Sequence, residues 1–186
     1  MKRPLISVLG LCALLSGCGG AAATSEPAST TTAVEETQQP IMAAGELTPG
    51  GTVANFGVHN LTSGFMPDPY TVDVVSGGGI DASTSNAGAG CAGWVTGQPD
   101  VIVNFEEMSG FLRFAFRPTA DGADGTLVIN DGQGNWHCND DASGLNPVVD
   151  LADAPPGQYD IWIGSYNSED RITGQLLVTE LTEVMP

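Results

Sequence analysis

Residues 157–164 read Gly-Gln-Tyr-Asp-Ile-Trp-Ile-Gly, and their side chains alternate in the way that a half-buried β-strand requires. Tyr159, Ile161 and Ile163 would all lie on one face of such a strand. The pattern predicts a strand over residues 158–166 whose apolar face belongs to a hydrophobic core.

The same alternation appears in other segments of the chain. Residues 100–105 place Val101, Val103 and Phe105 on one face, and residues 112–117 alternate in the same way. Further strands are predicted over residues 70–75, 126–130, 147–151 and 175–181. Helical periodicity is absent, and Gly, Asp, Asn and Pro recur about every eight to twelve residues. The sequence therefore predicts an all-β sandwich of short strands.

Two short polar segments have the composition of tight turns. Residues 121–125 read Asp-Gly-Ala-Asp-Gly, and residues 130–135 read Asn-Asp-Gly-Gln-Gly-Asn. Gly and Asn tolerate positive φ, and an Asp side chain can hydrogen-bond its own backbone. We expect Asn130, Asp131 and Gly132 to form the corner of a β-hairpin.

The N-terminal residues have the features of a bacterial export signal. A basic start, residues 1–4, precedes an apolar run over residues 5–15 that is shorter than the roughly 20 residues needed to span a bilayer. The run ends in Leu15-Ser16-Gly17-Cys18, which resembles the bacterial lipobox. The resemblance implies that Cys18 is lipidated and becomes the mature N-terminus, while an ordinary export cleavage region is the alternative. With Gly19 after the anchor, it also implies the outer membrane, on the periplasmic or surface side, if the cell is Gram-negative.

Composition divides the chain into three regions. Residues 1–17 form the predicted signal peptide. Residues 18–46 consist mainly of Ala, Thr, Ser, Glu, Gln and Pro, and they cannot bury enough apolar surface to offset the entropy of ordering. We predict that this region is a disordered tether between the lipid and the domain. Residues 47–186 have the size of one domain and form the predicted β-sandwich.

The chain is strongly acidic. It has 22 Asp and Glu residues against five Lys and Arg residues, and two of those five, Lys2 and Arg3, would leave with the signal peptide. Nucleic acid and anionic membrane surfaces need clustered cations on a protein, so the charge argues against both as partners. Cations are the natural partners of such a chain, and bound calcium would relieve part of its self-repulsion.

The four cysteines separate by their place in the chain. Cys12 would leave with the signal peptide and Cys18 is the predicted lipid site, so Cys91 and Cys138 remain in the folded domain. Two cysteines in an exported domain predict one disulfide bond, which in the chain-entropy model stabilises the fold by about 4 kcal/mol. A catalytic cysteine is the alternative interpretation.

The order of several motifs resembles a known family. Residues 125–130 read Gly-Thr-Leu-Val-Ile-Asn, residues 134–141 read Gly-Asn-Trp-His-Cys-Asn-Asp-Asp, and the strand at 157–164 follows. This series resembles the pre-peptidase C-terminal domain over residues 91–181. The resemblance implies a non-catalytic, calcium-associated sandwich of jelly-roll type with about eight strands. Those domains usually follow a secreted peptidase, for which this chain has no room.

Acidic and amide side chains near the turns are candidates for a calcium site. The predicted ligands are Asp121, Asp124, Asn139, Asp140 and Asp141. Calcium needs several carboxylate and carbonyl oxygens that converge from flexible loops. The alternative is that these residues form turns and carry solvated charges. The spacing of an EF-hand loop is not found.

Tryptophan rings are candidates for carbohydrate binding. Trp136 and Trp162 are the predicted ligand-binding residues, because flat rings serve as platforms for sugar faces. Trp162 lies with Asp160 on the face of its strand opposite to Tyr159, where the ring can be exposed. The alternative is that these rings fill the core or cover its edge.

The sequence lacks the patterns of the common hydrolases. The chain has two histidines, His59 and His137, and no Gly-x-Ser-x-Gly motif or close-spaced histidine pair. Glu106 and Glu107 are adjacent, so on a strand they would face apart and could not act as paired acid and base. We therefore predict that the protein is not an enzyme.

The leading hypothesis is a lipid-anchored, extracytoplasmic binding or accessory module that associates with calcium. The alternatives are a carbohydrate- or cell-wall-binding module and a chaperone or localising partner of a secreted peptidase. The membrane, through the N-terminal lipid, is the partner that all three hypotheses share.

Overall fold

The computed structural model describes residues 45–186 of the chain, so the predicted signal peptide and Cys18 lie outside the described residues. The strands are β1 (Val58–Leu61), β2 (Tyr70–Val75), β3 (Ile80–Asp81), β4 (Trp94–Val95), β5 (Val101–Phe105), β6 (Ser109–Pro118), β7 (Gly125–Asn130), β8 (Trp136–Asn139), β9 (Val148–Ala154), β10 (Gly157–Ser165) and β11 (Thr173–Thr179). One 3-10 turn, η1 (Ala82–Thr84), is the helical segment of the described residues. Within residues 45–186, no helix has the length and apolar character needed to cross a bilayer.

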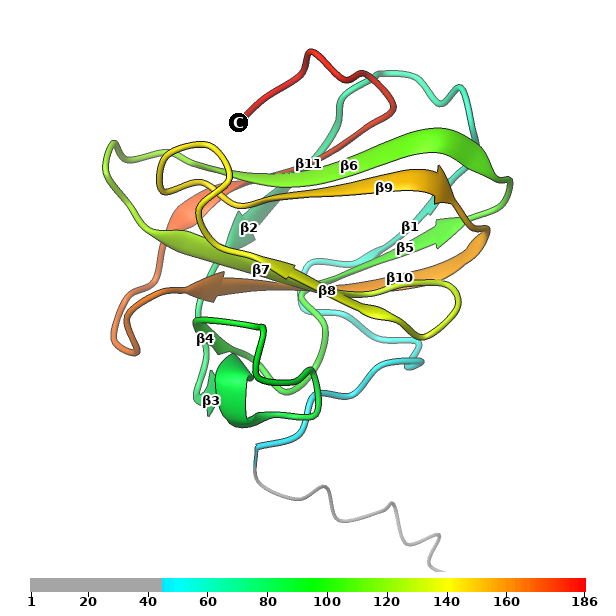
Figure 1. Ribbon diagram of the computed structural model, residues 1–186. Coiled ribbons are helices and arrows are strands. Elements are labelled where there is room, and N and C mark those ends of the chain that lie inside the picture. Colours follow the sequence, from blue (N-terminus) through cyan, green and yellow to red (C-terminus); the bar gives the residue numbers. More distant parts are fainter. Residues whose placement is uncertain (1–44) are drawn as a thin grey trace, which may run out of the picture. The chain divides into compact units, whose positions relative to one another are not determined.

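Eight of these strands form a jelly roll. One sheet has the order β2-β11-β6-β9, and the second contains the order β5-β10-β7-β8 (Figure 1). Two four-stranded sheets whose neighbours are mostly non-consecutive are what two Greek keys produce. The second sheet is extended by β1, which pairs with β5, and by β4 and β3 beyond β10. The predictions of an all-β sandwich and of jelly-roll topology are confirmed.

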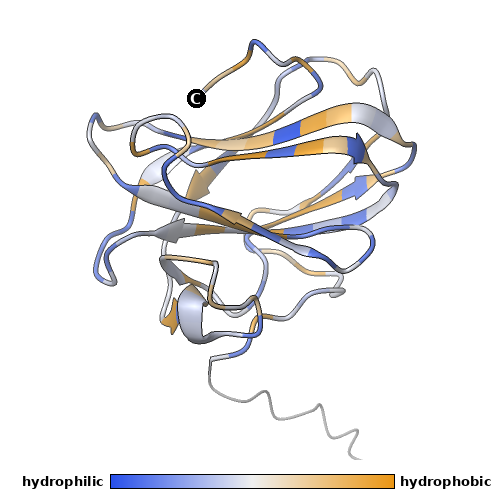
Figure 2. Cartoon of the chain, in the orientation of Figure 1, coloured by the Kyte–Doolittle hydropathy of each residue, from blue (hydrophilic) through white to orange (hydrophobic). Residues whose placement is uncertain are grey.

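The main core lies between the two sheets. Tyr159, Ile161 and Ile163 are fully buried there, as the alternation of residues 157–164 predicts. The Tyr159 ring lies 5.4 Å from the Phe114 ring, measured between centroids, and 6.5 Å from that of Phe105. Figure 2 shows that hydrophobic residues follow the strands and are interrupted by single hydrophilic ones. Burial of these alternating faces is the main favourable free energy of the fold.

Sequence patterns alone missed four strands, β1, β3, β4 and β8. Each is between two and four residues long, too short for alternation to be seen. β1 also runs parallel to β5, with Val58 opposite Ile102, so no hairpin connects the two. β8 does follow β7 through the predicted hairpin, whose turn is closed by the Asp131 N–H donating to the Asn135 carbonyl at 2.9 Å.

Two segments cover the outer face of the larger sheet, the one that contains β10. The strap, residues 45–56, contributes the buried side chain of Leu47, and the cap, residues 80–97, contributes Ala82, Cys91 and Val95. They pack around Trp162 and Val128 to form a second, smaller core, and Figure 1 places the cap against this sheet. The predicted disulfide between Cys91 and Cys138 is present, with a Cα–Cα distance of 5.1 Å, and it bonds the cap to β8.

Candidate functional site

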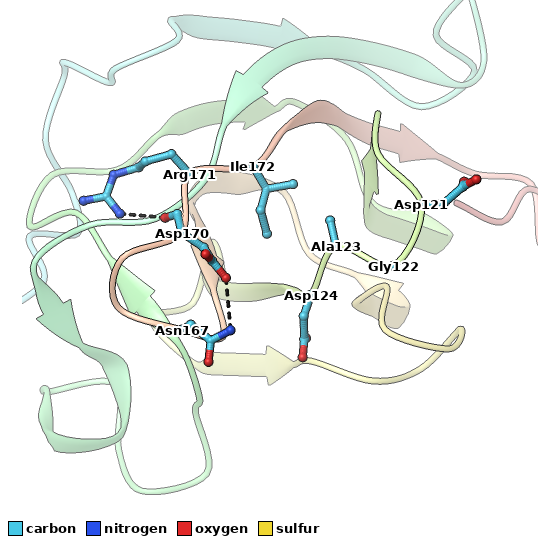
Figure 3. Close-up of a pocket in the computed structure, with 8 residues that line it drawn as sticks. All are labelled: Asp121, Gly122, Ala123, Asp124, Asn167, Asp170, Arg171 and Ile172. Carbon is cyan, nitrogen blue, oxygen red and sulfur yellow. Dashed lines mark hydrogen bonds between the residues drawn. The ribbon is translucent and has the colours of Figure 1, made fainter.

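A cleft of about 330 Å³ opens at the end of the sandwich where β6 leads into β7 and β10 leads into β11. Its walls are the loops 119–124 and 166–172, and the Tyr166 N–H, which donates to the Asp124 carbonyl at 3.0 Å, connects them. Asp170 accepts hydrogen bonds from Asn167 Nδ2 at its carboxylate and from Arg171 Nη1 at its backbone carbonyl (Figure 3). The cleft is therefore polar and largely acidic.

Asp124 is the unusual group in this cleft. Its Oδ1 atom is buried and has no hydrogen-bond partner in the structure. Burial raises the pKa of Asp124 above its ordinary value, and the negative charges of Asp141, Asp140 and Asp170 raise it further. The site thus holds an oxygen with an unused acceptor in a negative field, which favours a proton or a cation.

The structure brings together part of the predicted calcium set. Asp124, Asp140 and Asp141 lie within electrostatic range of one another. Asp121 lies on the rim and points away from Asp124 (Figure 3). Asn139 uses its side-chain oxygen to accept the backbone amides of Ala142 at 3.1 Å and Val148 at 2.9 Å, so it holds the loop before β9. In residues 45–186, no three acidic, His or Cys side chains already converge as a metal site.

Asp170 was missed by sequence analysis. It lies 46 residues after Asp124 and 29 after Asp141, in the loop between β10 and β11. Only the pairing of β10 with β7, with Ser165 opposite Gly125, brings the loops that follow and precede these strands to one end of the sandwich.

The prediction of an exposed Trp162 ring is wrong. The outer face of β10 is covered by the strap and the cap, so the Trp162 side chain has 0% exposure. Trp136 is partly exposed, and its ring centroid lies 5.5 Å from that of Trp162. The two predicted ligand-binding rings therefore pack against each other at an interplanar angle of 37°, and Trp162 offers no open platform.

Both histidines make bonds that hold the fold. His59 Nδ1 lies 2.9 Å from the Tyr70 hydroxyl and its Nε2 lies 3.2 Å from the Phe56 carbonyl. His137 Nε2 lies 2.8 Å from a carboxylate oxygen of Asp131, in the β7–β8 hairpin. Burial alone would raise the pKa of Asp131, but His137 and the backbone amides of the turn outweigh burial and hold it below its ordinary value.

Asp100 is a second buried carboxylate that the sequence did not single out. It is 1% exposed and joins three segments of the chain. Asn55 Nδ2 donates to it at 2.7 Å and the Ile163 N–H at 2.8 Å, while the Thr96 hydroxyl lies 3.2 Å away. Burial raises the pKa of Asp100 to about 6, although these hydrogen bonds lower it.

This raised pKa predicts a pH-dependent stability. Folded Asp100 binds its proton more tightly than the unfolded chain does, so its contribution is complete below about pH 4 and is lost as the pH rises through about 6. The loss should reach about 3 kcal/mol in the free energy of unfolding. Urea unfolding of the Asp100→Asn variant between these pH values should show a correspondingly smaller decline than the wild type.

Asn104→Ala is a matched control, because Asn104 donates to Asn60 and does not contact Asp100. It should keep the pH dependence of the wild type. Identical pH profiles of the wild type and Asp100→Asn would show that Asp100 does not titrate in this range.

Comparisons with known proteins give a likeness of fold. No family model matches the chain, and no curated protein matches it. Among solved structures, it is similar to the pre-peptidase C-terminal domain of a collagenase from Bacillus anthracis, with 15% identity over 66% of this chain and 94% of that one and a TM-score of 0.41. It is also similar to PliG, a periplasmic inhibitor of g-type lysozyme from Aeromonas hydrophila, with 10% identity over 66% of this chain and 96% of that one and a TM-score of 0.34.

Identities and scores at this level carry no information about ligand or activity. The strand order makes the described residues a jelly-roll sandwich, and the likeness to a pre-peptidase C-terminal domain is one of fold alone.

Proposed function

We propose that the protein is a non-catalytic binding module, held at the bacterial cell envelope by a lipid on Cys18, and that its acidic cleft binds calcium. The observation that carries the calcium proposal is the buried, unpartnered Oδ1 atom of Asp124 beside three other carboxylates. His59 supports a non-catalytic role, because both of its ring nitrogens are in contact with neighbours, the Tyr70 hydroxyl and the Phe56 carbonyl. Mass spectrometry of the mature N-terminus tests the anchor, and an unmodified Cys18 would exclude it.

The donor set of the cleft suits a hard cation. Asp124 and Asp170 line the cleft, and the charges of Asp140 and Asp141 act on Asp124 from nearby. All four carry carboxylate oxygens, the ligands that calcium prefers. A bound divalent ion would offset their mutual repulsion and give Asp124 Oδ1 a partner. Asp121 and Asn139 are left out of this set, since one points away and the other is bonded to the backbone. The loops would have to close on the ion, because the carboxylates do not already converge.

Calcium is expected to raise the melting temperature at constant ionic strength. A ligand that binds only the folded state, present at 100 times its dissociation constant, stabilises by about 2.7 kcal/mol. Asp124→Asn should abolish the calcium-dependent rise. The same substitution should leave the protein without calcium equally or more stable, because it removes a partly buried charge that neighbouring carboxylates repel.

Asp121→Asn is the matched control for this experiment, and it should keep the calcium response. Equal shifts with magnesium or with added sodium chloride would mean that cations only screen the charge of the protein. An unchanged response in Asp124→Asn would reject this cleft as the binding site.

The alternative functions receive less support. Trp136 and Trp162 were predicted to bind carbohydrate by stacking on sugar rings. The Trp162 ring is buried, so it cannot contact a sugar in this arrangement. No observation on residues 45–186 points specifically to a peptidase partner. Both remain outcomes that binding assays with polysaccharides and envelope extracts can reveal.

A further inference from the structure

The central part of the cap contributes little apolar surface of its own. Residues 82–93 read Ala-Ser-Thr-Ser-Asn-Ala-Gly-Ala-Gly-Cys-Ala-Gly. Its backbone bonds largely close on the cap itself; the Ala82 N–H, for example, donates to the Gly93 carbonyl at 2.9 Å. Segments with few apolar contacts and many exposed backbone groups have low local stability and open without global unfolding.

Apart from the packing of Ala82, Cys91 and Val95 in the smaller core, few bonds hold the cap to the rest of the domain. β4 pairs with β10 at one position, Trp94 opposite Ser165. Asn86 exchanges two hydrogen bonds with the backbone of Leu47 in the strap, at 2.8 and 2.9 Å. The disulfide between Cys91 and Cys138 links the middle of the cap covalently to β8. We therefore expect the disulfide to contribute much of the stability of the closed cap.

The closed cap covers a polar atom that has no partner. The Trp162 ring is fully buried, and its Nε1–H makes no hydrogen bond in the structure. A buried donor without a partner loses its hydrogen bond to water, which costs about 1 to 3 kcal/mol. Opening the cap would return this hydrogen bond, so part of the free energy favours the open arrangement. The disulfide between Cys91 and Cys138 opposes this opening.

We propose that the Cys91–Cys138 disulfide is a redox latch, whose reduction by a dithiol opens the cap and exposes Trp162 and Trp136. A thiolate of the reductant attacks Sγ of Cys138, which is partly exposed, and Sγ of buried Cys91 leaves as a thiolate and takes up a proton. The second thiol of the reductant then attacks the mixed disulfide and releases Cys138 as a thiol. The dithiol is oxidised to a disulfide, and the two electrons and two protons pass to the protein.

Tryptophan fluorescence can measure the opening. In the Trp94→Phe/Trp136→Phe variant, emission comes from Trp162, so acrylamide quenching reports on that ring. We expect the quenching constant to rise several-fold when dithiothreitol reduces the protein. Cys91→Ser/Cys138→Ser in the same background should show the high value without dithiothreitol and should not respond to it.

Hydrogen exchange on the natural sequence provides an independent measurement. Reduction should remove protection from the Leu47 and Cys91 amides while the β10 amides keep theirs. Two outcomes would overturn the latch. One is an unchanged quenching constant and exchange pattern after complete reduction. The other is loss of protection throughout β10, which would make the disulfide a support of the whole sandwich.

Discussion

Replacing Trp162 with alanine is expected to lower the free energy of unfolding by about 4 kcal/mol. The side chain is completely buried between the larger sheet and the segments that cover it, where it contacts a cluster that includes Val128, Val95 and Leu47. Truncating a large aromatic residue at such a position removes its transfer free energy and leaves a cavity, which typically costs about 3 to 5 kcal/mol. Urea unfolding at constant pH would measure the loss.

Trp136→Ala is the natural comparison, since Trp136 packs against Trp162 but is partly exposed. It should cost clearly less than Trp162→Ala. If Trp162→Ala instead left the free energy of unfolding within about 1 kcal/mol of the wild type, the ring would not be the centre of a packed cluster. Loss of polysaccharide binding in a fully stable Trp162→Ala protein would restore the carbohydrate hypothesis.

Removal of the disulfide has an expected effect of similar size. Cys91 and Cys138 are 47 residues apart in the chain, and closing a loop of that length in the unfolded state stabilises by about 4 kcal/mol in the chain-entropy model. Cys91→Ser/Cys138→Ser should lose about this amount in urea unfolding. Small domains have about 5 to 15 kcal/mol in total, so the sandwich should remain folded.

The reduced wild-type protein is a second way to remove the same bond. It should have the same free energy of unfolding as Cys91→Ser/Cys138→Ser, and dithiothreitol should not affect the variant. A loss below about 1 kcal/mol in both would mean that the bond does not restrict the unfolded chain as the entropy model requires.

Local patterns were sufficient for much of the fold. Alternation located the long strands, because a side chain's face in a strand depends only on its position along that strand. Residues 157–164 are an example, and the buried faces of Tyr159, Ile161 and Ile163 agree with it. The hairpin corner at Asp131 followed from turn chemistry, and the disulfide followed from there being two cysteines in the predicted domain.

The candidate site was predicted less completely. Of the predicted ligands, Asp140 and Asp141 act electrostatically on Asp124, whereas Asn139 accepts hydrogen bonds from backbone amides, and Asp170 comes from a distant loop. Asp100 looked like the polar end of a strand, yet it is buried among three donors from separate segments. The positions of these side chains depend on which loops meet at an end or an edge of the sandwich. Local sequence patterns do not predict which loops meet.

The amino-acid sequence was sufficient to predict the fold class, the core faces of the long strands and the disulfide, because these follow from local periodicity, turn preference and the number of cysteines in the domain. What covers the other face of β10 depends on the tertiary structure. Alternation places Trp162 opposite the main core, and it cannot say whether that side meets water or protein. The strap and the cap, which lie more than sixty residues before Trp162 in the chain, cover this side and bury the ring. Burial of this kind depends on packing between distant parts of the chain.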